Sequence, residues 1–81
     1  FSLAQALLQE GQVTEAEPHL RVCIKKKPDW MVAHIALGKA LIELGRPEEA
    51  RPILRAAHQL AIEQNHEEPE VELSTLLKQI A

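Results

Sequence analysis

The feature that most constrains the fold of this chain is an internal duplication with a period of 34 residues. When the sequence is aligned with itself at this offset, residues 1–28 match residues 35–62. Nine pairs are identical, well above what chance gives in so short a window: Leu3/Leu37, Ala6/Ala40, Leu7/Leu41, Gly11/Gly45, Glu15/Glu49, Ala16/Ala50, Pro18/Pro52, Leu20/Leu54 and Arg21/Arg55. A period of this length is typical of proteins in which each copy is one small unit and the stacked copies bury a continuous core.

Each copy shows the spacing of two helices. Apolar residues recur three and four positions apart, as Leu3 and Leu7 do, which places them on one helix face. Gly11 and Gly45 interrupt this pattern where a helix would end, because glycine readily takes the left-handed conformation that closes a last turn. The sequence therefore predicts a helix, a tight turn and a second helix in each copy.

Residues near the predicted helix starts fit this division. Asp29 directly precedes an apolar run over residues 30–44, where its carboxylate could accept hydrogen bonds from the free amides of a new helix. Pro47 suits the first residue of a helix, since its missing amide has no partner there. The run over residues 30–44 contains only three polar side chains, so we expect its helix to be covered on several sides.

A fifth helix is expected after the duplication. The composition becomes acidic after Asn65, and an apolar stripe then follows along one helix face: Leu73, Leu76, Leu77 and Ile80. Such a helix covers the open apolar face of the last repeat. We therefore predict one all-α domain over residues 1–81, with repeat 1 at about 1–28, repeat 2 at about 29–64 and a capping helix at about 67–80.

Charge and sulfur content narrow the class of partner. The net charge of −3 offers no general attraction to nucleic acid or to anionic lipid. No apolar stretch approaches the roughly 18 residues of a membrane span. Cys23 is the single cysteine, so no intramolecular disulfide can form, and a reducing, cytoplasmic location fits best. We expect protein or peptide partners, with no nucleic acid and no membrane.

The 34-residue period and its motifs resemble the tetratricopeptide repeat. The second copy carries His34-x2-Leu37-Gly38-x2-Leu41 and Ala50-x3-Leu54-x2-Ala57, and the first carries Leu3-Ala4-x2-Leu7 and Ala16-x3-Leu20-x2-Cys23-x4-Pro28. The resemblance covers roughly residues 1–62. It departs from the family pattern at His34, Leu41 and Ile62, where the family often has Trp, Tyr and Pro.

Two repeats and one further helix are similar to small stand-alone bacterial members of this family whose function is unassigned. The resemblance implies a scaffold or adaptor that binds other proteins, with no catalysis and no cofactor. It also implies a ligand surface on the concave face, at the positions Phe1, Gln5, Leu8, Gln9, Val32, Ile35, Lys39, Ile42 and Glu43. Apolar residues beside one lysine suit an amphipathic helix or an extended peptide, with an acidic group on Lys39.

A second interpretation of this surface stays open. Val32 and Ile35 could be covered by the fifth helix or by a second copy of the chain. The chain would then be a structural or oligomerisation segment of a larger protein, with its own groove occupied. Sequence alone does not distinguish an exposed apolar patch from a covered one.

The histidines and the cysteine form no convincing site. His19 and Cys23 lie four residues apart and share a helix face, as a base and a nucleophile or two metal ligands would. A packing role is favoured, because Cys23 occupies a small-residue position and a buried thiol behaves as a small hydrophobe. The remaining histidines form no paired ligand motif. We therefore predict no enzyme activity, no catalytic residues and no metal site.

Opposite charges gather at two helix ends. The basic cluster comprises Arg21, Lys25, Lys26 and Lys27, and the acidic one comprises Glu67, Glu68, Glu70 and Glu72. Both suit the dipole of the helix end on which they lie. They could also steer copies of the chain head to tail into a homo-oligomer.

Overall fold

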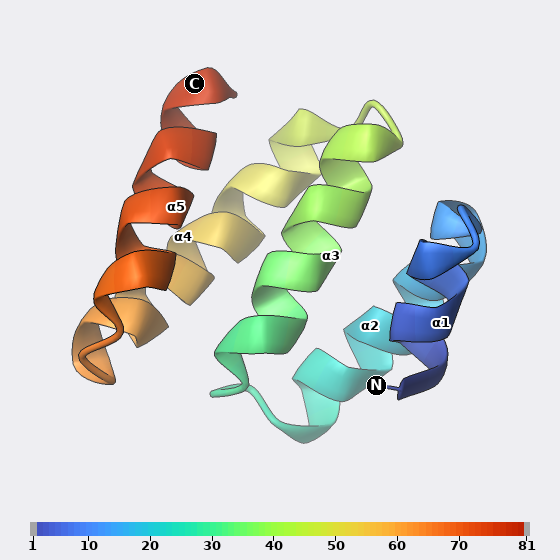
Figure 1. Cartoon of the computed structure of the whole chain (residues 1–81), viewed down its shortest axis with the longest axis horizontal. Helices are drawn as coiled ribbons and strands as arrows, with labels where there is room; N and C mark the ends of the chain where they lie inside the picture. The colour runs from blue at the N-terminus through green and yellow to red at the C-terminus, as the bar shows by residue number, and fades with distance from the viewer. Residues whose placement is uncertain (1, 81) are drawn as a thin grey trace.

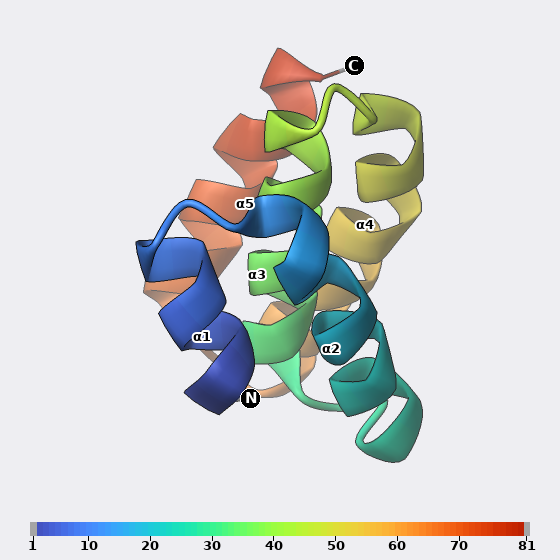
Figure 2. The same cartoon turned by 90° about the vertical axis from the view of Figure 1, so that its right-hand side faces the viewer.

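The computed structural model describes residues 2–80, which form five α-helices in two layers. The helices are α1 (Ser2–Gln9), α2 (Val13–Lys26), α3 (Met31–Glu43), α4 (Pro47–Glu63) and α5 (Glu67–Gln79). Helices α1, α3 and α5 form one layer, and α2 and α4 form the other (Figure 1 and Figure 2). The predicted all-α architecture, with two helix-turn-helix units and a fifth helix packed on α4, is confirmed.

Left-handed residues close the turns, as the glycines predict. Gly11 has φ +79° between α1 and α2, and Gly45 has φ +75° between α3 and α4. In each turn the backbone amide of the residue after the glycine donates a hydrogen bond to the carbonyl oxygen five residues earlier. Arg46 N, for example, donates to Leu41 O at 2.8 Å. Asn65, with φ 58°, is the left-handed residue between α4 and α5. A short polar side chain tolerates this backbone conformation better than most.

The helix starts agree with the prediction at one position and differ at another. Pro47 is the first residue of α4, as expected. The prediction that Asp29 caps α3 is wrong, because Trp30 occupies the N-cap position and no side chain caps this helix. Trp30 N donates to Lys27 O at 3.0 Å, and this turn places Asp29 one residue too early.

The core consists of leucines separated by alanines. Its five largest fully buried side chains are Leu20, Leu37, Leu41, Leu54 and Leu73. Each contributes roughly 1.5–3 kcal/mol by leaving water. Helix α3 lies between α2 and α4 and buries seven residues, so the expectation that it is covered on several sides is confirmed.

One contact sets how closely α3 and α4 approach. A Cβ atom added to Gly38 would lie 2.6 Å from Cγ of Leu54 and nearer still to its Cδ2 atom. Leu54 is completely buried, so its side chain has little room to move away. The absence of a side chain at position 38 therefore allows this pair of helices to pack as it does.

We expect Gly38→Ala to destabilise the protein by roughly 1–2 kcal/mol in urea unfolding. Overpacking a core lowers the free energy of unfolding by about 1–3 kcal/mol. The higher helix propensity of alanine offsets up to about 1 kcal/mol of this loss. Leu54→Ala should lose about 2–5 kcal/mol by itself. The double variant should lose less than the sum, since removing Leu54 relieves the clash, and additive losses would contradict this account.

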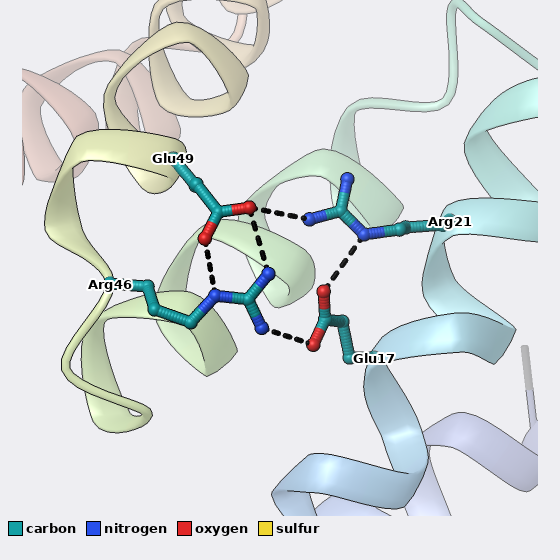
Figure 3. Close-up of polar contacts among 4 residues, drawn as sticks. All are labelled: Glu17, Arg21, Arg46 and Glu49. Carbon is teal, nitrogen blue, oxygen red and sulfur yellow. Dashed lines mark hydrogen bonds and ion pairs between the residues drawn. The ribbon is translucent and has the colours of Figure 1, made fainter.

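A network of four charged side chains joins the two repeats (Figure 3). Arg46, at the start of α4, donates through Nη1 to Glu17 of α2 at 2.6 Å and through Nη2 to Glu49 at 2.8 Å. Arg21 of α2 donates to Glu17 at 2.9 Å and reaches Glu49 at 3.5 Å. The network thus connects the turn of the second copy to the second helix of the first.

The arginines lower the pKa of both carboxyl groups. A hydrogen bond from Arg46 is the main cause for Glu17 and also for Glu49. A pKa lower in the folded chain than in the unfolded one stabilises the fold above the ordinary value of 4.5. That stabilisation is lost as the pH falls below it, because the unfolded chain then binds more protons.

Arg46→Gln should therefore flatten the pH dependence of stability on the acid side. Between about pH 5 and pH 3, the free energy of unfolding should fall less steeply for the variant than for the parent protein. Urea unfolding at a series of pH values measures the two slopes. Arg55→Gln serves as the control, because Arg55 is exposed and takes no part in the network. Equal slopes for Arg46→Gln and the parent would show that the network is not populated in solution.

Candidate functional site

A groove of about 350 Å³ runs between α1 and α3 on the side where the first layer faces solvent. Among residues 2–80, its lining residues belong to these two helices: Gln5, Leu8, Val32, Ile35, Ala36, Lys39, Ala40 and Glu43. Residues three and four apart on α3 supply most of the lining, because they share one helix face. The pattern that buries the other face of α3 thus leaves this one over the groove.

The floor of the groove is apolar and its edges are polar. Ala40 is buried and Ile35 is half-buried against the core, whereas Val32 keeps 47% of its surface exposed. Lys39 and Glu43 are exposed at the edge. Such a surface can bury an apolar side chain of a ligand and bind a charged group beside it.

Helix α5 reaches the edge of the groove through an ion pair. Nζ of Lys39 lies 2.5 Å from Oε1 of Glu72, and each side chain is about half exposed. No groove-lining residue belongs to α5, which packs mainly on α4. Within residues 2–80, the fifth helix therefore leaves Val32 uncovered.

Six of the nine residues expected on the concave face line this groove: Gln5, Leu8, Val32, Ile35, Lys39 and Glu43. Ile42 is half-buried and packs against the hydrophobic core, and Gln9 is exposed outside the groove. Phe1 lies outside the described residues. Their part in binding a partner stays a prediction.

The predicted ligand surface did not include two alanines in the floor of the groove. Ala36 and Ala40 lie four and eight residues after Val32, on the same face of α3. The helical spacing alone could have indicated them. A search for large side chains passes over such positions, although small residues there create the depth of the groove.

A second hollow, of about 320 Å³, lies on the opposite side between α2 and α4. Its lining residues are Arg21, Ile24, Lys25, His34, Leu37, Pro52, Ile53 and Ala56. His34 is only 6% exposed, and its Nδ1 atom lies 2.8 Å from the carbonyl oxygen of Trp30. A carbonyl oxygen accepts hydrogen bonds, so Nδ1 carries the hydrogen that joins them. This burial makes His34 a packing residue of α3.

The other candidate chemical groups are His19 and Cys23. His19 is exposed and Cys23 half-buried, and both line a hollow on the outer face of α1 and α2. Among residues 2–80, no three His, Cys, Asp or Glu side chains lie close enough to hold a metal ion together. In the same part of the chain, no helix has the length and apolarity needed to cross a membrane.

We expect His34 to be the Nδ1–H tautomer whenever its ring is neutral. Long-range ¹H–¹⁵N NMR correlations identify the protonated nitrogen of each histidine. The exposed His19 provides the comparison, because no protein group within residues 2–80 holds either of its nitrogens. A neutral His34 ring protonated on Nε2 would contradict the hydrogen bond to Trp30.

The sequence model of the tetratricopeptide repeat family matches residues 7–79. This match begins in α1 and ends in α5, so it includes the fifth helix, beyond the 1–62 covered by the motifs themselves. No curated protein and no solved structure matches the chain significantly.

Proposed function

The chain belongs to the tetratricopeptide repeat family, and on that premise we propose that it is a scaffold or adaptor holding a peptide or a helix in the groove between α1 and α3. Repeats of this family generally mediate protein–protein interactions and are in general non-catalytic scaffolds. The proposed role is accordingly binding without chemistry or cofactor. The single cysteine favours a reducing, cytoplasmic setting for it.

The observation that carries this proposal is the exposed apolar strip in the groove. Val32 is almost half exposed beside the half-buried Ile35 and Leu8. Large apolar side chains left in contact with water on a concave surface favour a ligand that covers them. A volume of about 350 Å³ suits a few ligand side chains and not a folded domain.

The charges beside the strip indicate what the ligand should carry. Lys39 is already paired with Glu72, so a ligand carboxylate has to displace that side chain. Glu43 forms no ion pair within residues 2–80 and is exposed. A basic group can therefore bind Glu43 directly, and we infer a ligand with an apolar anchor and a nearby lysine or arginine.

Two exposed residues allow a matched test. Peptides selected from a displayed library on the parent protein should bind Val32→Glu at least about tenfold more weakly, because a carboxylate then lies in the apolar strip. Ile62→Glu is the control, since Ile62 is 44% exposed on α4 and outside the groove. The affinity of the same peptides for Ile62→Glu should differ from that for the parent protein by less than about twofold, which is under about half a kcal/mol.

Calorimetry measures both affinities, and circular dichroism checks that the variants keep their helices. Chemical shifts of the parent protein should move at groove residues when a peptide is added. Peptides that bind both variants equally well would place the site elsewhere. A library that yields no binder would favour the alternative, a structural or oligomerisation segment with its groove occupied by a neighbour.

A further inference from the structure

Beyond the groove, each end of the helical stack carries an apolar patch, and the charged residues that border the two patches have opposite signs. The longest axis of the molecule, 29 Å, runs from α5 at one end to α1 and α2 at the other (Figure 1). Most of the exposed large apolar side chains lie outside the groove. We define a head patch on the outer face of α1 and α2 and a tail patch on α5.

The head patch is an apolar hollow with a basic edge. Leu3 and Val22 are each exposed over half their surface or more, on either side of a hollow of about 470 Å³. Lys26 and Lys27 stand beside it, and the Lys27 ammonium lies 5.4 Å from the centre of the Trp30 ring. Lys26 forms no ion pair with any residue of the described chain.

The tail patch is a single apolar side chain surrounded by carboxylates. Val71 is 67% exposed, more than any other large apolar residue within residues 2–80. It shares a shallow hollow with Glu67, Glu68 and Glu72. Glu67 and Glu68 precede Val71 by four and three residues, so all three lie on one helix face. This face is opposite the one that α5 buries through Leu73.

We propose that copies of this chain associate head to tail, with the tail patch of one copy on the head patch of the next. Val71 enters the hollow between Leu3 and Val22. The carboxylates of Glu67 and Glu68 then lie beside Lys26 and Lys27. Each patch thus meets an apolar surface and a charge of the opposite sign.

A second copy is the partner that these observations favour. Both complementary surfaces belong to one chain, and their positions at opposite ends let a copy use both at once. Contact between two head patches or two tail patches would bring like charges together. The association is therefore heterologous, and each copy can bind one neighbour through its head patch and another through its tail patch.

The basic cluster seen in the sequence is only partly available for this contact. Arg21 is held by Glu17 and Glu49 in the network between the repeats, and it lies on the other side of α2. The contact therefore depends on Lys26 and Lys27. A patch this small and this exposed gives a weak, salt-sensitive association.

Sedimentation equilibrium of the 81-residue chain tests the proposal. At about 0.05 M salt, the mass should rise with concentration above the 9.1 kDa of the monomer. At about 1 M salt, where the Debye length is about 3 Å, it should return towards the monomer. Trp30 is the single tryptophan and lies at the head patch, so its fluorescence should shift to shorter wavelength over the same concentration range.

Two variants give a sharper result. Val22→Glu removes the head contact and Val71→Glu removes the tail contact, and each alone should reduce the association constant at least about tenfold. A mixture retains one competent interface, the Val71→Glu head with the Val22→Glu tail. The other combination would oppose two carboxylates. The mixture should therefore form dimers and nothing larger.

Val32→Glu is the matched control, because it alters the groove between α1 and α3 and neither patch. It should associate like the parent protein, which separates this proposal from the proposed function. A parent protein that stays monomeric at low salt up to about 1 mM, a concentration that detects a millimolar Kd, would overturn the proposal. So would a mixture of the two variants that stays monomeric, or association unaffected by Val22→Glu.

Discussion

The close contact between α3 and α4 is the constraint on which the rest of the structure depends. Helix α3 lies between α2 and α4, and Leu54 packs where Gly38 has no side chain. Because Gly38 has to face Leu54, this contact fixes how α3 is rotated about its own axis. That rotation decides which α3 residues reach the core and which face the groove. The apolar strip near Val32 is therefore a consequence of packing on the opposite side of the same helix.

Sequence periodicity predicted most of this architecture, because repeat proteins bury their cores through contacts between neighbouring units. The 34-residue offset and the glycines at positions 11 and 45 were sufficient to place the first four helices. The start of α3 was not predictable in the same way. An acidic residue before an apolar run is a frequent cap, but the turn between α2 and α3 shifted the cap to Trp30.

The candidate site was predictable only in part. Helical spacing and family resemblance indicated most of the groove lining, since these depend on one helix at a time. Contacts between helices depend on the length and orientation of side chains, and the spacing of residues along the sequence does not determine these. The pairing of Lys39 with Glu72 and the bond between Arg46 and Glu17 are of this kind. The same limit explains why the hollow between α2 and α4 was missed.

Helix α5 repeats α3 at an offset of 36 residues, two more than the period of the duplication. Leu73 and Leu77 take the places of Leu37 and Leu41, but Ser74 stands where α3 has Gly38. A hydroxymethyl group at that point keeps a further helix from approaching α5 as closely as Leu54 brings α4 to α3. Helix α5 thus shares the leucines of α3 and lacks the glycine that lets α3 approach a neighbouring helix so closely.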